Sequence, residues 1–266
     1  MLQFPVCHWG GIINPHFRGN QWGENQDTLL GVADSNLFTC SVHFRHGPNE
    51  APNNSFIDIF QFLTFHPQFG LEGEPFTLVA SRLLSVHPLK SFEGGTISLT
   101  LFYPLQTPGF GRVQIITEVV NVYDEEWHHV VFSVNSVDDD SSKVFLDGVD
   151  KTNTNPDHNP IGTNFGFDNI TETQIANTVS VVGRPMFDSC LQELWIEFGV
   201  FFDLTNPVNL SKFDFGTLGL NGENPTGSTP ALFFKGGQDF LTNKGDGGAF
   251  TQVGTLVDCP APLTNT

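Results

Sequence analysis

EWHHVVFSVNSVDDDSSKVFLDGV, residues 126–149, has the pattern of two antiparallel strands joined by a polar tip. Its apolar runs, His128–Val134 and Lys143–Leu146, are rich in the β-branched and aromatic residues that favour strands. The acidic run Asp138–Ser142 lies between them and is most simply the tip of a hairpin. We therefore predict a β-hairpin over this stretch.

Residues at both ends of this hairpin suit a tight β structure. Asp147 and Gly148 follow the second run and supply the two positive-φ positions of a type I′ turn, which reverses the chain again. Trp127 comes just before the first run. We expect its large apolar ring to anchor the core at the start of that strand.

A second clean strand pattern lies in Leu37–Arg45, where the even positions from Phe38 to Phe44 are apolar and the odd ones polar. This period of two is typical of a strand buried on one face. Residues 56–65 are apolar on both faces, and their aromatic and β-branched content favours a strand over a short helix. Further strands are predicted at Phe76–Leu84, Thr96–Tyr103, Arg112–Val120, Thr178–Val182, Leu191–Phe198, Ala231–Phe234 and Ala249–Leu256.

So many strands can bury their apolar faces only by stacking two sheets or by closing a barrel. The chain has 266 residues, and its 27 Gly and 17 Pro are scattered along it, which fits one all-β domain with tight turns. We predict a sandwich of two antiparallel sheets over residues 31–258. An irregular N-terminal arm is expected over residues 1–30 and a C-terminal tail over residues 259–266.

The charge of the chain limits its partners. It has 29 Asp and Glu against 11 Lys and Arg, a formal net charge of -18. Such a charge repels phosphate backbones and anionic lipid surfaces alike. We therefore expect no nucleic acid partner and no membrane partner.

The cysteines indicate neither a metal site nor a redox site. Cys7, Cys40, Cys190 and Cys259 lie far apart and form no CxxC motif. The N-terminus has no basic region followed by an apolar run, so we expect no secretion signal. On that ground we predict buried thiols in preference to disulfides, and no metal or cofactor.

The hairpin of residues 126–149 resembles the central hairpin of laminin-G-like jelly rolls in its order of aromatic residue, strand, loop, strand and Asp-Gly. A second segment, Gly183–Phe187 followed by Cys190–Glu197, resembles the closing strand of the same fold, with Ser189 where the family usually has Gly. Three apolar positions of that strand would face the core, with a bulge explaining their uneven step: Leu191, Leu194 and Ile196. The resemblance implies a concanavalin A-like (lectin/glucanase) jelly-roll sandwich.

The C-terminal third resembles lectin-like proteins encoded by tailed bacteriophages and prophages. The similar segments are Pro225–Gly236 and Asn243–Thr251, and Ala33-Asp34-Ser35 fits the same proteins. This resemblance implies a location in the virion, with other capsid or tail proteins as partners. It also implies a homo-oligomer.

Glu193 and Glu197 are the residues with the strongest enzymatic resemblance. Retaining glucanases of this fold carry Glu, Asp and Glu at alternate positions of one strand, which places three acids on one face. Here the middle position is Trp195, and the segment also fits an ordinary closing strand. We therefore predict no catalytic residues and no enzymatic activity.

Two further groups could bind a metal, and for both a structural role is preferred. His128 and His129 are adjacent on a strand, so they point to opposite faces and cannot hold one ion together. Asp138, Asp139 and Asp140 could bind calcium, but a solvated acidic tip is the simpler interpretation. We predict no metal site, and the sequence identifies no ligand-binding residue.

Three functions remain open. The first is a non-enzymatic structural protein on the virion surface, either a capsid decoration or a tail-associated subunit. The second is a carbohydrate-binding module that recognises host surface glycan through aromatic platforms in rim loops. The third, a glycoside hydrolase, is opposed by the missing middle acid.

The N-terminal arm also has two interpretations. It contains Trp9, Phe17 and Trp22 among glycines and asparagines. These aromatic residues could anchor an interface with another protein. Alternatively, the arm folds back over its own sandwich and covers an exposed sheet edge.

Overall fold

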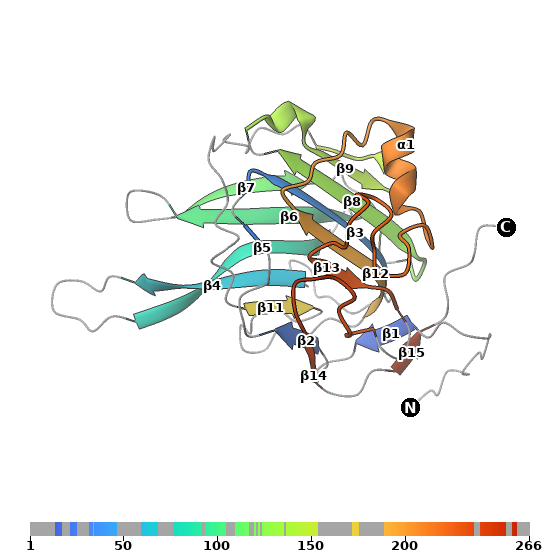
Figure 1. The fold of residues 1–266 in the computed structure, drawn as a ribbon. Helices are drawn as coiled ribbons and strands as arrows, with labels where there is room; N and C mark the ends of the chain where they lie inside the picture. The colour runs from blue at the N-terminus through green and yellow to red at the C-terminus, as the bar shows by residue number, and fades with distance from the viewer. Residues whose placement is uncertain are drawn as a thin grey trace.

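The computed structural model of the chain contains two antiparallel sheets (Figure 1). The structure describes residues 14–17, 22–25, 32–33, 35–46, 60–68, 77–91, 94–104, 110–116, 120, 122, 124–135, 137–153, 172–175, 189–236, 240–253 and 257–259. Strands β1, β2, β4 to β7 and β15 are described by their backbone alone. Every strand pairing within these residues is antiparallel.

The first sheet is built around the predicted hairpin. Its strands, in spatial order, are β10 (Val149–Asp150), β9 (Lys143–Leu146), β8 (His128–Asn135), β3 (Leu37–His46), β12 (Ser189–Phe198), β1 (Asn14–Phe17) and β15 (Val257–Cys259), and β13 (Leu232–Phe234) also pairs with β12. Short helical turns occur at Asp139–Ser141 (η1), Pro207–Leu210 (α1) and Ser211–Phe213 (η3).

The second sheet lies behind the first in the view of Figure 1. Its strands, in spatial order, are β14 (Thr251–Val253), β2 (Trp22–Asn25), β11 (Glu172–Ile175), β4 (Phe60–Gln68), β5 (Thr77–Ser91), β6 (Gly94–Pro104) and β7 (Phe110–Ile116). The predicted strands therefore all have counterparts, except Thr178–Val182, which lies outside the described residues.

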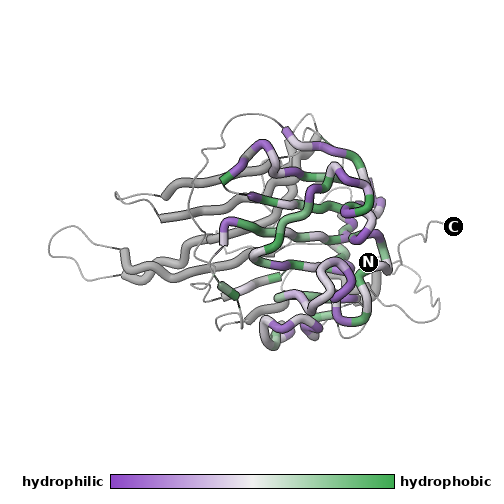
Figure 2. The backbone as a smooth tube through the Cα atoms, turned by 45° about the horizontal axis from the view of Figure 1, so that its top comes forward, coloured by the Kyte–Doolittle hydropathy of each residue, from purple (hydrophilic) through white to green (hydrophobic). Residues whose placement is uncertain are grey.

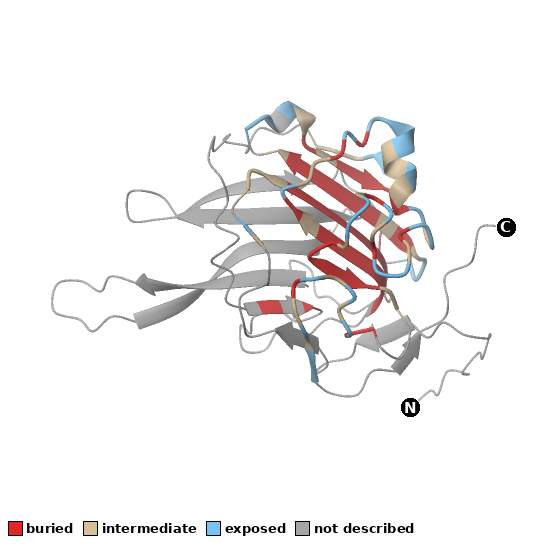
Figure 3. Ribbon diagram, viewed as in Figure 1, coloured by how far each residue is buried: buried red, intermediate tan, exposed pale blue. Residues whose placement is uncertain are grey.

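The sequence predicted β3 to be buried on one face, and the structure buries it on both. The apolar set of this strand is buried: Phe38, Cys40, Val42 and Phe44. The alternate residues Thr39, Ser41 and His43 are buried as well. The prediction was wrong because a later segment of the chain, described below, covers the polar face. In Figure 3 the central strands of the first sheet are mostly red, and exposed loops border them.

The turns of the central hairpin are confirmed. Asp147 and Gly148 have φ of 51° and 77°, as a type I′ turn requires, and they join β9 to β10. The acidic run forms the turn η1 between β8 and β9, and Asp138 and Asp140 are exposed there. In Figure 2 the hydrophilic colour gathers in such connecting loops, and hydrophobic colour marks the strands between them.

The bulge predicted in the closing strand is also confirmed. The register of β12 against β3 shifts between Gln192 and Trp195, and Glu193 has a φ of 48°. Leu191, Leu194 and Ile196 are all buried, and across the bulge Leu191 still pairs with Phe44 and Ile196 with Cys40, both in the apolar row of β3.

The tryptophan expectation needs correction. Trp127 is only half-buried, whereas Trp195 has no exposed surface and lies at the centre of the sheet. β8 begins at His128, as predicted, and Trp127 lies just before it, outside the strand. Trp195 is therefore the aromatic anchor of this sheet.

The N-terminal arm is not irregular throughout. Strand β1 lies between β12 and β15 in the first sheet, and β2 lies between β14 and β11 in the second. Two short strands hidden among Gly and Asn carry too few residues to show a period, which is why the sequence did not reveal them. Residues 14–17 and 22–25 thus contribute backbone to both sheets. At the other end of the chain, β15 ends at Cys259.

The expectation of a buried thiol was wrong for Cys190. Cys190 is disulfide-bonded, whereas Cys40 is a free, fully buried thiol whose pKa is raised by burial. Where side chains and backbone are described, no helix has the length and apolar character needed to cross a bilayer.

Candidate functional site

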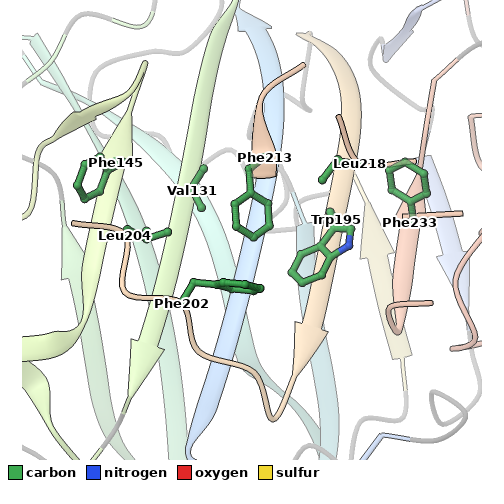
Figure 4. Packing of buried hydrophobic residues seen from close by; sticks show 8 residues of the cluster. All are labelled: Val131, Phe145, Trp195, Phe202, Leu204, Phe213, Leu218 and Phe233. Atoms are coloured by element: carbon green, nitrogen blue, oxygen red, sulfur yellow. The ribbon is translucent and has the colours of Figure 1, made fainter. Parts of the chain in front are cut away.

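Residues 199–224 form a cover over one face of the first sheet, and we call them the cover segment. Its apolar side chains meet those of the strands beneath in a single buried cluster: Val131, Phe145, Trp195, Phe202, Leu204, Phe213, Leu218 and Phe233 (Figure 4). Phe202, Phe213 and Trp195 contact one another edge to face, with ring centroids 5.2 to 6.5 Å apart. The face of the sheet is therefore filled by the chain itself.

Hydrogen bonds fasten the first part of the cover segment to the strands. The Thr39 hydroxyl donates to the Val200 carbonyl at 2.9 Å, and the Phe202 amide donates to the Ser133 hydroxyl at 2.8 Å. Thr39 and Ser133 also bond each other across β3 and β8, at 3.1 Å. These small hydroxyls explain why β3 has a polar row on a buried face.

Two further bonds fasten the later part. The Trp195 indole Nε1–H donates to the Gly222 carbonyl at 2.8 Å, and the Gly216 amide donates to Glu193 Oε2 at 2.9 Å. The buried polar atoms of Trp195 and Glu193 are thus satisfied by the cover segment, as burial requires.

The two glutamates that resemble catalytic acids both lie on β12, and the bulge falls at the first of them. Glu193 is at the bulge and is buried, and burial raises the pKa of its carboxyl group. Glu197 lies two residues past Trp195, and burial raises its pKa to about 7. Its two oxygens accept hydrogen bonds from the amides of Phe198 and Ala231, at 3.1 and 3.2 Å. Both carboxyl groups therefore serve as acceptors for backbone N–H groups.

A row of polar side chains lies beside the cover segment on the same face. His43 is paired in register with Gln192 on one side and with His129 on the other. The two imidazoles stack at 4.0 Å with 4° between their planes, and the edge of Phe215 meets His43 at 5.5 Å. Burial lowers the pKa of both histidines, to about 4 for His129, so both rings are neutral at pH 7.

This row has unused hydrogen-bonding capacity. His129 Nε2 bonds the Ser41 hydroxyl at 2.8 Å. By contrast, His43 Nδ1 and Gln192 Oε1 are buried without a hydrogen-bond partner. A small polar group, such as water or a hydroxyl, would satisfy both atoms.

His128 points away from this row, as its adjacency to His129 predicted, and it meets two carboxylates. Its Nδ1 lies 2.8 Å from Asp147 Oδ2, and its Nε2 lies 3.0 Å from Asp124 Oδ1. Burial favours the neutral ring, but the bonds to the two carboxylates outweigh it and raise the pKa of His128. Within the described residues, no three His, Cys, Asp or Glu side chains are arranged to hold a metal ion.

The sequence did not predict the cover segment. Its Phe residues follow neither a period of two nor one of 3.6, because they come from turns and short helical pieces. The only available signal was the density of Phe and Leu between Val200 and Leu220 in a stretch without strand alternation.

No protein-family model matches this sequence, and no curated protein matches it. Several solved structures share its fold. A Bacteroides ovatus protein described as carbohydrate-binding aligns with 96% of this chain and 62% of its own, at 13% identity and a TM-score of 0.52. Laminin α1 domains LG4–5 from mouse align over 72% of this chain and 44% of theirs, at 10% identity and a TM-score of 0.40. An endo-β-1,4-glucuronan lyase from Trichoderma reesei aligns over 68% of this chain and 77% of its own, at 12% identity and a TM-score of 0.37.

These matches bear on the fold alone. The chain is an antiparallel β protein similar to concanavalin A-like jelly rolls, as the resemblance implied. It spans less than two thirds of the length of the Bacteroides and laminin chains. The phage origin stays a prediction.

Proposed function

We propose that this chain is a non-enzymatic structural protein on the surface of a tailed-phage particle, built on a concanavalin A-like jelly-roll sandwich. The resemblance of the C-terminal segments supports the location, as either a capsid decoration or a tail-associated subunit. The Cys190 disulfide supports a protein that works outside the reducing cytoplasm.

The observation that carries the non-enzymatic part is the filled face of the first sheet. A hydrolase or lyase needs an open cleft with acids free to touch the substrate. Here the cover segment packs on Trp195, and the carboxyl groups of Glu193 and Glu197 are bonded to backbone amides. These bonds engage both acids within the chain, which supports a role other than bond cleavage.

The non-enzymatic proposal is tested by assaying the full chain for turnover of neutral β-glucans and polyuronates. We expect no release of reducing ends and no unsaturated product. Turnover that is lost in Glu193→Gln but kept in the exposed control Glu126→Gln would overturn the proposal.

The location is tested by imaging purified particles labelled with an antibody against this chain. Regular labelling of the capsid or of the tail is the expected result. Particles that lack the chain entirely would contradict a virion role.

A second candidate function is glycan binding, and the polar row beside Phe215 favours it. The half-buried ring of Phe215 lies against His43, close to the unsatisfied atoms of the row. Aromatic faces beside a few polar groups are common in sugar sites. Binding on a glycan array that disappears in Phe215→Ala, with the fold intact, would support this role, and an array without signal would oppose it.

A further inference from the structure

Three titratable side chains, those of Asp124, His128 and Asp147, form a cluster away from the cover segment. Asp124 belongs to the connection that precedes β8, and Asp147 is the first residue of the turn between β9 and β10. His128 begins β8 and lies between them. The cluster therefore joins a loop to a hairpin turn through one imidazole ring.

The hydrogen-bond geometry of the His128 ring indicates its charge. Both ring nitrogens lie within hydrogen-bond distance of a carboxylate oxygen, at 2.8 and 3.0 Å. A carboxylate can only accept, and a neutral imidazole can donate from only one nitrogen. Both bonds can therefore form between ionised partners only when His128 is the imidazolium cation.

The same carboxylates hold the backbone of the two elements. The second oxygen of Asp147, Oδ1, accepts the amide of His129 at 2.8 Å, and Asp124 Oδ1 accepts the amide of Glu126 at 3.0 Å. Asp147 also occupies the first positive-φ position of the type I′ turn between β9 and β10. Loss of the ring's charge would therefore loosen both attachments.

We propose that His128 is a protonation-controlled latch that holds the loop 124–126 against the β9–β10 turn in mildly acidic solution and releases it as the pH rises. When the ring loses its proton, one carboxylate loses its donor, and the two carboxylates face a neutral ring. This latch is independent of the function proposed above.

Other charged and titratable groups surround the latch and fix the direction of the effect. From the loop come Glu125 and Glu126, both exposed, and from β3 comes Arg45, whose Nε donates to the Glu125 carbonyl. From β8 comes His129, which stays neutral because burial lowers its pKa to about 4. The acidic neighbours favour the imidazolium, as the two bonded carboxylates do.

The sign of the pH dependence follows from the pKa shifts. Burial opposes protonation of His128, yet the bonds to Asp147 and Asp124 raise its pKa above the ordinary value of 6.5. Its stabilisation is therefore complete below about 6.5 and is lost as the pH rises through the folded pKa. The pKa of Asp124 is lowered, because its bond to His128 outweighs burial, so its contribution is lost only when the pH falls below its usual 3.8.

The test uses the full chain and two backbone reporters. Amide hydrogen exchange of Glu126 and His129, corrected for the intrinsic pH dependence, should show protection that falls severalfold between pH 6 and pH 8.5. His128→Gln should remove this pH dependence, and Asp124→Asn should weaken it. Asp138→Asn is the control for Asp124→Asn, because it removes the same charge at an exposed position. It should leave the pH dependence of amide protection unchanged.

A second measurement does not depend on any variant. The imidazole nitrogens of His128, followed by NMR in the unmodified protein, should titrate above the ordinary histidine range. A ring that titrates at or below 6.5, or protection of both amides that is constant with pH, would overturn the latch.

Discussion

Trp195 shows how one side chain can hold a cover onto a sheet. It has no exposed surface, it contacts Phe202 and Phe213, and its Nε1–H reaches the Gly222 carbonyl. In a ligand-binding jelly roll a tryptophan in such a place could stack on a substrate. Here its ring and its polar atom are both used within the chain.

The different burial of Trp195 and Trp127 predicts different losses of stability when each is replaced by alanine. We expect Trp195→Ala to lower the free energy of unfolding by about 3 to 5 kcal/mol, as for a fully buried aromatic residue. Trp127→Ala should cost clearly less, because Trp127 is only half-buried. Denaturant midpoints of the two variants measure the difference, and an equal loss would show that Trp127 is a core residue after all.

Alanine substitutions at two glycines allow the cost of backbone strain to be measured apart from the cost of a steric clash. Gly222 and Gly227 have nearly the same φ, 80° and 85°, which is unfavourable for any residue with a Cβ. A Cβ on Gly222 would lie 2.8 Å from Phe233 Cγ and 2.9 Å from Pro230 Cγ, whereas one on Gly227 would meet nothing within 4 Å.

We therefore expect Gly227→Ala to cost about 1 to 2 kcal/mol, the price of a left-handed alanine alone. Gly222→Ala should cost about 1 to 3 kcal/mol more, from overpacking against the ring and proline. Thermal unfolding of both variants provides the measurement. If the two losses are equal, the Gly222 turn must have room to shift, and the cover is looser than its contacts indicate.

At the scale of elements, the strands with regular alternation were predictable and the irregular ones were not. β3 was found almost to the residue because it keeps a period of two, and β8 and β9 because their apolar runs are rich in β-branched and aromatic residues. The bulge in β12 was also predictable, from the uneven step between Leu191 and Leu194. β1, β2 and β11 have four residues each, which is too short for a period to be seen.

The candidate site was predictable only in part. The positions of Glu193 and Glu197 on the closing strand, and the opposite directions of His128 and His129, follow from strand geometry alone. The burial of both faces of the first sheet does not follow from strand geometry. It depends on the cover segment, which is rich in turns and lies far along the chain. Nor could the sequence reveal that Asp124 and Asp147, 23 residues apart in numbering, bond the same imidazole ring.

The two strands within the N-terminal arm allow a test of the arm's role. Deletion of residues 1–24 removes β1 and most of β2, which leaves the edges of β12 and β15 in the first sheet unpaired. We expect a lower thermal midpoint and increased aggregation, because unpaired edges expose backbone N–H and C=O groups. Deletion of residues 1–13 alone keeps both strands and serves as the control. A truncated chain with an unchanged midpoint would instead favour the arm as a docking device.

On the scale of the whole molecule, the negative charge is unevenly distributed. Strands β4 to β7 contain no Asp or Glu, whereas acidic residues gather in the loops of the first sheet. Loop 124–126 and the tip Asp138–Asp140 are clear examples, each with three acids in succession. Repulsion within the folded chain is therefore concentrated at the ends of the central hairpin.

This distribution predicts a response to salt. With a net charge of -18, the folded protein should gain stability when added NaCl screens its self-repulsion, so the thermal midpoint at pH 8 should rise between about 10 mM and about 0.1 M salt. The double variant Asp138→Asn and Asp140→Asn removes two charges from an exposed tip, so its midpoint should start higher at low salt and rise less. Because exposed residues away from special features contribute little else to stability, the difference between the two proteins isolates the electrostatic part. A midpoint that is flat with salt in both proteins would mean that counterions or bonded partners already neutralise the hairpin ends.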